Sequence, residues 1–209
     1  MPAVQVQARV LRRRGADELR RAAGRRVDPL RVIERLGSRE VYRNNWMRVR
    51  EDEVRFSGGA TGIYGVVEKP DFALVVPVDG GQLWLVEQYR YPVGDRFWEF
   101  PQGSWEDAAL QQLPPEELAR AELAEETGLH AERMTHMGHL YEAYGFSNQG
   151  FDVFVAEGLS QRDRRPTPSE QDMVVGSFER PEVESMVADG RIKDAPTVAA
   201  LALLLLSGR

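Results

Sequence analysis

The sequence predicts an α+β fold in which helices cover a β-sheet and a small antiparallel β-unit precedes it. Three observations carry this prediction. Short strand patterns alternate with turns from Val41 onward, two later strands are apolar along nearly their whole length, and an acidic helix and an apolar helix follow. A strand that is apolar on both faces needs cover on both faces, so we expect helices on each side of the sheet.

The composition excludes several classes of protein. The chain has 209 residues, 42% of them hydrophobic, which is enough for one domain with an accessory segment. It has no cysteine, so disulfides, thiolate zinc sites and a cysteine nucleophile are excluded, and we expect a cytoplasmic protein. A net charge of -6 argues against a protein that coats nucleic acid. The longest apolar run, 198–206, is too short to cross a bilayer, so it predicts a buried helix, and we expect no membrane as a partner.

The first segment, residues 1–40, is predicted to be an Arg-rich N-terminal extension, with arginine clusters at 12–14 and 20–21. Three interpretations of it stay open: an organellar transit peptide, a phosphate- or RNA-binding arm, or a poorly ordered or docked extension. The last is favoured, because its first 26 residues lack the apolar core of a secretory signal and have no aromatic side chain to stack on a base.

The next segment, residues 41–70, predicts the small antiparallel β-unit. Its expected elements are strands at 41–49 and 54–56 around a charged turn at 50–53, then a strand at 62–68 before a turn at 69–71. The remaining residues, 71–209, predict the main domain. Its expected elements are a hairpin of strands 72–78 and 83–90 turning at Asp79-Gly80-Gly81, a strand at 97–100 leading to Gly103, an acidic helix, strands at 134–144 and 151–156, a helix at 181–188 stopped by Gly190, and a final helix capped by Asp194.

The acidic helix carries the first functional signal. Prolines and acidic residues at 114–117 favour its start, and Gly128 favours its end. Glu122, Glu125 and Glu126 stand at i, i+3 and i+4, so their carboxylates share one face. Like charges at this spacing repel, and a hard divalent cation such as Mg²⁺ would relieve that repulsion. A solvated acidic face is the alternative.

The strand, glycine loop, acidic helix and glycine stop together resemble the Nudix box of the Nudix hydrolases, G-x5-E-x7-R-E-U-x-E-E-x-G-U with U aliphatic. Residues 122–129 match its second half. The first half differs: the family arginine falls on Ala121, the first glutamate on Leu113 and the first glycine on Asp107, unless residues are inserted after Gly103. Arg120 lies about 100° around the helix from the arginine position and does not replace it.

Other segments resemble the ADP-ribose pyrophosphatase branch of that family. Gln88-Tyr89-Arg90 matches a segment whose arginine contacts the diphosphate or terminal ribose, and the β-unit matches one that builds a swapped homodimer. The loop at 144–149 falls where the branch has a proline and a substrate-binding acid, here replaced by Tyr144 and Gln149. Lys193-Asp194-Ala195 also resembles the branch.

The resemblance implies a Nudix α/β/α sandwich with a mixed sheet and an N-terminal antiparallel β extension, assembled as a homodimer. It also implies the site residues. The metal ligands for Mg²⁺ or Mn²⁺ are Glu122, Glu126, Glu125 and the Gln102 carbonyl, and the substrate contacts are Arg90, Gln149 and Trp46. The catalytic carboxylates are Glu125 and Glu170, which follows the polar loop 160–169, with Asp172 as the second choice for the base at that loop. For Trp46, as for Trp98, a place in a strand core is the alternative.

The implied reaction is metal-dependent hydrolysis of the pyrophosphate bond in a nucleoside diphosphate linked to another group. ADP-ribose is the leading substrate and would give AMP and ribose 5-phosphate. A nucleotide sugar or another Nudix substrate is the first alternative. The divergent first half of the box keeps a second alternative open, a catalytically weak domain that only binds its ligand. A nucleic-acid-binding protein that uses the N-terminal arginines is the third.

Overall fold

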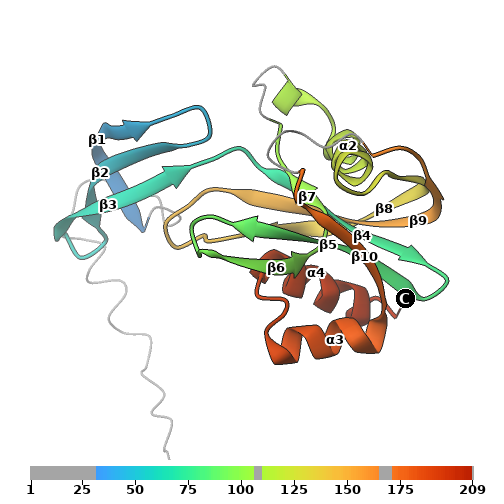
Figure 1. Cartoon of the computed structure of the whole chain (residues 1–209). Coiled ribbons are helices and arrows are strands. Elements are labelled where there is room, and N and C mark those ends of the chain that lie inside the picture. The colour runs from blue at the N-terminus through green and yellow to red at the C-terminus, as the bar shows by residue number, and fades with distance from the viewer. Residues whose placement is uncertain (1–31, 106–109, 165–170, 209) are drawn as a thin grey trace, which may run out of the picture.

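The computed structural model describes residues 32–105, 110–164 and 171–208. These residues form a small antiparallel sheet and a larger mixed sheet with helices on both faces (Figure 1). The elements in chain order are β1 (Ile33–Arg43), β2 (Arg48–Phe56), β3 (Thr61–Glu68), β4 (Phe72–Asp79), β5 (Gln82–Arg90), β6 (Asp95–Glu99), β7 (Gln102–Gly103), the 3₁₀ helix η1 (Leu110–Gln112), α2 (Pro115–Thr127), β8 (Leu129–Tyr141), β9 (Gly150–Gln161), β10 (Val174–Glu179), α3 (Arg180–Asp189) and α4 (Ala195–Leu206). The α+β class is confirmed.

The larger sheet has the strand order β10-β5-β4-β9-β8, with β6 paired to β5 and β7 paired to β4. Strands β4 and β9 are parallel, while the other pairs of this sheet are antiparallel, so the predicted mixed sheet is confirmed. Strand β4 lies at the centre, and its side chains from Ala73 to Pro77 are buried on both faces, as its apolar sequence predicts.

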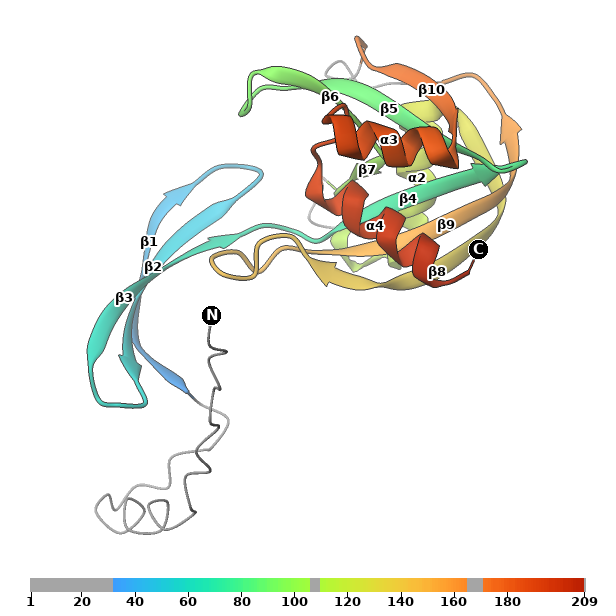
Figure 2. The same cartoon turned by 90° about the horizontal axis from the view of Figure 1, so that it is seen from below.

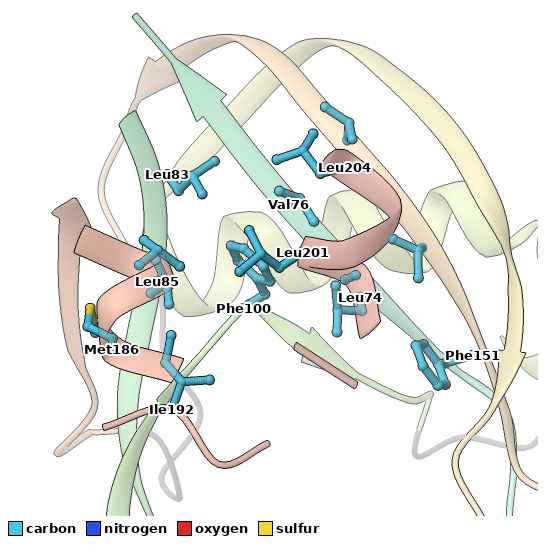
Figure 3. Packing of buried hydrophobic residues seen from close by; sticks show 14 residues of the cluster. Leu74, Val76, Leu83, Leu85, Phe100, Phe151, Met186, Ile192, Leu201 and Leu204 are labelled. Carbon is cyan, nitrogen blue, oxygen red and sulfur yellow. The ribbon is translucent and has the colours of Figure 1, made fainter. Parts of the chain in front are cut away.

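Helices close a hydrophobic core on each face of this sheet. Helix α2 packs Leu118 and Leu123 against Ala73, Val75 and Phe154 on one face. On the other face, helices α3 and α4 cover a cluster drawn in Figure 3, whose labelled residues are Leu74, Val76, Leu83, Leu85, Phe100, Phe151, Met186, Ile192, Leu201 and Leu204. Successive side chains along β4 point to opposite faces of the sheet, so this one strand contributes to both cores and connects the two helix layers.

The predicted helix ends are confirmed. Gly128 and Gly190 end α2 and α3 in the left-handed conformation, with φ of 74° and 84°. A Cβ at Gly128 would lie 2.6 Å from the carbonyl oxygen of Arg162, so glycine is also required by space. Asp194 caps α4 by accepting a hydrogen bond from the Thr197 N–H at 2.8 Å. No helix in the described part of the chain is long and apolar enough to span a membrane.

Strands β1 to β3 form a sheet that we call the arm, and it extends away from the main sheet (Figure 2). Two main-chain hydrogen bonds join it to the loop between β8 and β9: the Val67 N–H donates to the Phe146 carbonyl at 2.8 Å, and the Asn148 N–H donates to the Val67 carbonyl at 3.2 Å. The Tyr64 hydroxyl adds a bond to the Gly145 carbonyl at 3.0 Å. The arm is thus tied to the loop that follows β8.

The prediction of a charged turn at 50–53 is wrong. These residues lie inside β2, where Arg39 pairs with Glu51 at 2.7 Å and Arg50 pairs with Glu68 at 2.7 Å across the strands. The turn falls earlier, at Asn44, whose side-chain oxygen accepts hydrogen bonds from two following N–H groups. Because the arm buries few side chains, its strands can carry charges that would signal a turn in a buried sheet.

Candidate active site

One cleft is lined by three of the residues that the sequence predicts for the site, Arg90, Gln102 and Gln149. It has a volume of about 920 Å³ and opens where β5 ends and β4, β9 and α4 begin. Gly103 also lines it. Two other hollows, of about 440 and 430 Å³, are lined by none of the predicted site residues. The large cleft is therefore the candidate active site.

The acidic helix meets the cleft through strand β7. The Gln102 N–H donates to Oε2 of Glu126 at 3.1 Å, and the Glu126 side chain is only 2% exposed. The Glu122 carboxylate lies against the α-carbon of Gly103, because a Cβ built there would come within 2.5 Å of Oε2. Only a residue without a side chain admits Glu122 at this position. Glycine in the loop and glutamates on the helix therefore belong to one arrangement.

The two carboxylates suit a hard divalent cation. Glu126 approaches the Gln102 N–H and Glu122 approaches the Gly103 α-carbon, and carboxylate oxygens are ligands that Mg²⁺ and Mn²⁺ prefer. Within residues 32–105, 110–164 and 171–208, no three His, Cys, Asp or Glu side chains form a metal-binding group by themselves. A cation here would thus need main-chain or substrate oxygens in addition to Glu122 and Glu126. Glu125 is half-buried beside Glu126.

Arg90 lies in the cleft wall as one member of an ion pair. Its Nε donates to Oε2 of Glu99 at 3.0 Å, and its Nη2 contacts the other oxygen of the same carboxylate. The Gln88 amide donates to Oε1 of Glu99 at 2.7 Å. Glu99 is 1% exposed, so Arg90 and Gln88 satisfy a carboxylate that has almost no contact with water.

Burial sets the protonation of this pair. Burial raises the pKa of Glu99 above its ordinary value, and the charge and hydrogen bonds of Arg90 act against that rise. Burial alone would lower the pKa of Arg90, but the attraction of Glu99, Asp194 and Glu126 outweighs it and the pKa is raised. Arg90 thus stays cationic in a cleft that is otherwise rich in carboxylates, and it is placed to attract an anionic group.

Family models match nearly the whole described chain. Residues 68–201 match the NUDIX domain, and residues 33–67 match the nucleoside diphosphate sugar hydrolase N-terminal domain. The chain belongs to the Nudix hydrolase family. An ADP-ribose pyrophosphatase of Mycobacterium tuberculosis (strain ATCC 25618 / H37Rv) is 32% identical over 171 residues, which cover 81% of each chain. A methanol dehydrogenase activator of Bacillus methanolicus is 27% identical over 169 residues, which cover 80% of this chain and 89% of the relative.

The fold is also that of a solved structure. The crystal structure of an ADP compounds hydrolase superimposes with a TM-score of 0.74 at 21% identity and covers 87% of this chain and 98% of the other. The Nudix sandwich predicted from the sequence is therefore confirmed. The protein is a Nudix enzyme that hydrolyses the pyrophosphate bond of a nucleoside diphosphate compound, and Nudix hydrolases generally use divalent metal ions.

Other residues predicted from the Nudix resemblance do not meet in the cleft. Trp46 lies on the turn of the arm, 59% exposed, and does not line the cleft within a single chain. Glu170 lies outside the described residues. Asp172, the second choice, forms an ion pair with Arg96 at 2.6 Å. Trp98 packs edge to face against Phe178, so its alternative place in the core is confirmed.

Sequence reasoning missed several residues of the Nudix cleft. Glu99 lay unnoticed in a strand expected to be buried, although a single carboxylate among apolar neighbours is a signal of an ion pair. Lys69 and Lys193 also line the cleft, and the Lys193 ammonium lies 4.8 Å from the centre of the Phe97 ring. Lys69 carries no such signal, because isolated lysines are common on any surface. Lys193 and Asp194 were noted only as part of a segment that resembles the ADP-ribose pyrophosphatase branch, and Asp194 as a helix cap.

Proposed function

We propose that this Nudix hydrolase cleaves ADP-ribose to AMP and ribose 5-phosphate in a reaction that requires Mg²⁺, with Mn²⁺ as a substitute. The observation that carries the proposal is the meeting of Glu122 and Glu126 with strand β7 at the edge of a cleft that also holds Arg90. The name of the mycobacterial relative supports ADP-ribose as the first substrate to test.

Each residue has a defined task in this proposal. Glu122, Glu126 and Glu125, with the Gln102 carbonyl, hold the cation, which when bound neutralises charge on the diphosphate and acidifies a water molecule. The fixed guanidinium of Arg90 orients the diphosphate. Glu170, or Glu125, accepts the proton of the attacking water.

Gln149 supports a substrate with hydroxyl groups next to the diphosphate. Its Nε2 donates to the Pro70 carbonyl at 2.8 Å, and this bond fixes which way the amide points. Its Oε1 is buried in the cleft wall and has no hydrogen-bond partner among the described residues. A buried acceptor without a donor is costly, so a sugar hydroxyl of the substrate is well suited to complete it.

We further propose that the protein is a cytoplasmic homodimer whose arm packs against a second copy. Apolar side chains on the arm stand in water, among them Ile63, which is 66% exposed, and Trp46. Exposed apolar side chains gathered on one element commonly mark an interface. Pairing through the arm would give Trp46 a protein surface to cover it and offers it a place beside the partner's cleft. Light scattering of wild type and Ile63→Glu tests the dimer, and a wild-type monomer at micromolar concentration contradicts it.

The reaction is tested by release of AMP from ADP-ribose with Mg²⁺, measured against an EDTA control. Glu126→Gln keeps the shape of the side chain and removes its charge. Turnover of this variant should fall on the order of 1,000-fold, which corresponds to about 4 kcal/mol of transition-state stabilisation. A parallel screen of nucleotide sugars, NADH, diadenosine polyphosphates and coenzyme A identifies the preferred group. Wild-type turnover that persists in EDTA would refute the metal requirement.

A second candidate is a Nudix domain that binds its ligand with little turnover. It is favoured by Ala121 and Leu113, which replace an arginine and a glutamate of the Nudix box, and by the Bacillus methanolicus relative, whose name is that of an activator. Saturable binding of ADP-ribose without release of AMP, in the presence of Mg²⁺, would select this candidate.

A further inference from the structure

A cluster of carboxylates gathers around Gln102. Its side-chain Nε2 donates to Oδ2 of Asp194 at 3.0 Å. Its main-chain N–H donates to Oε2 of Glu126 at 3.1 Å. One residue therefore supplies donors to two carboxylates that are far apart in the chain, one just before α4 and one on helix α2.

Glutamine is chemically suited to this place. Glu99 and Glu126 are buried, so the repulsion between negative charges is weakly screened by water. A glutamine offers two amide hydrogens and one main-chain hydrogen, and it carries no charge. It can therefore satisfy Asp194 and Glu126 without placing a fixed cation beside Glu126, where a lysine or arginine would compete with a bound metal ion.

The anchor of the Gln102 side chain is itself fixed. Oδ2 of Asp194 also accepts the Thr197 N–H at 2.8 Å, at the start of α4. The Thr197 hydroxyl oxygen accepts the Phe100 N–H at 2.9 Å, and Thr197 is fully buried. The hydrogen bonds thus run from Gln102 through Asp194 and Thr197 back to the chain just before β7. The start of α4 therefore holds the chain at Phe100 and at Gln102.

The geometry points to Gln102 as a positioning residue: its side chain, anchored on Asp194, holds strand β7 where the Gln102 main chain meets the Glu126 carboxylate. This inference rests on the function proposed above, in which Glu126 and the Gln102 carbonyl hold a divalent cation. It assigns to the start of α4 a part in metal binding, although α4 lies on the opposite face of the sheet from α2.

The test replaces Gln102 by methionine, which keeps the length of the side chain and removes both amide hydrogens. Gln161→Met is the matched control, because the Gln161 amide also donates two hydrogen bonds, to the carbonyls of Thr127 and Arg162, at the far end of β9. Two quantities are measured for each protein: the Mg²⁺ concentration that half-saturates turnover of ADP-ribose, and the rise in Tm caused by Mg²⁺ alone.

We expect Gln102→Met to need about 10- to 100-fold more Mg²⁺, the usual effect of removing a residue that orients a metal ligand. Its kcat at a fixed Mg²⁺ concentration should fall while its KM for ADP-ribose changes little, and its Mg²⁺-induced rise in Tm should shrink. Its Tm without metal should match that of Gln161→Met, whose Mg²⁺ response should equal that of wild type.

The outcomes separate this inference from the proposed function. A Gln102→Met protein with the wild-type Mg²⁺ requirement and the wild-type rise in Tm overturns the positioning role. If the methionine variant does not fold, Gln102→Asn replaces it, since its amide is one methylene too short to reach Asp194. A wild-type protein that Mg²⁺ stabilises but that releases no AMP contradicts the proposed function, and the Tm measurements still decide the role of Gln102. A wild type that neither gains Tm from Mg²⁺ nor releases AMP overturns both.

Discussion

Gly103→Ala should separate metal binding from folding. The new methyl group would lie 2.5 Å from Oε2 of Glu122, and ordinary van der Waals contact begins at 3.4 Å, so the carboxylate must retreat by about 1 Å. The backbone itself is not strained, because the φ of Gly103 is not positive. The clash falls on the far end of a side chain, which can turn away at little cost to the fold.

The expected loss is therefore one of activity. A misplacement of about 1 Å in a catalytic arrangement can reduce turnover about 100-fold, which corresponds to about 2.7 kcal/mol of transition-state stabilisation. The Tm without metal should stay within about 3 °C of wild type, since a change of 1 kcal/mol in unfolding free energy shifts it by about 2–4 °C in a chain of this size. Release of AMP over a Mg²⁺ titration, with thermal unfolding in EDTA, measures both effects.

Two comparisons make this prediction refutable. Gly65→Ala adds a methyl group that meets no atom within 4 Å, so it controls for the general effect of alanine in a strand. If Gly103→Ala acts only through Glu122, the double variant Gly103→Ala/Glu122→Gln should be no less active than Glu122→Gln alone. Additive losses, or wild-type turnover and Mg²⁺ dependence in Gly103→Ala, would refute the reasoning.

Four further outcomes follow from the contacts. Arg90→Ala should lower the free energy of unfolding by up to roughly 3 kcal/mol, because it leaves Glu99 buried and unpaired. It should also lower kcat/KM roughly 10- to 100-fold. Adding Glu99→Gln should restore the stability measured by urea unfolding but not kcat/KM. Because burial raises the pKa of Glu99, the folded protein binds the Glu99 proton more readily than the unfolded chain does. As pH falls from 7 toward 4.5, the ordinary pKa of a glutamate, the Tm of wild type should therefore rise relative to the Tm of Glu99→Gln. Thr197→Val should cost about 1–3 kcal/mol in urea unfolding, because the Phe100 N–H loses its buried acceptor. Ala121→Arg should lower the Mg²⁺ requirement by restoring a cation beside the acidic face, and an unchanged Mg²⁺ titration would show that another cation already orients that face.

Features that depend on local chemistry could be predicted from the sequence. The positive φ of Gly128 and Gly190 and the capping bond of Asp194 involve residues only a few positions away. The apolar run of β4 is an equally direct signal, because a strand covered by helices on both faces has apolar residues at successive positions. These signals are sufficient for the helices and the central sheet.

Features that depend on distant partners could not be predicted. The charges of β2 find their partners on β1 and β3, so the same residues that suggested a turn stabilise a strand. The contact of Glu122 with Gly103 joins the helix to a strand whose spacing in the family pattern is not kept. Arg90 was predicted as a substrate contact, but its ion pair with Glu99 lies off the register of β5 and β6, which sets Arg90 opposite Asp95.

The two-sided burial of β4 also has a consequence for how the chain is made. The side chains of Leu74 and Val76 leave the ribosome well before helix α4, which covers them, and before β9, their parallel neighbour. Until then the hairpin of β4 and β5 presents an apolar strand with no layer on either face, a common starting point for aggregation. High-level expression should therefore depend on chaperones that hold this hairpin until the later elements have been synthesised.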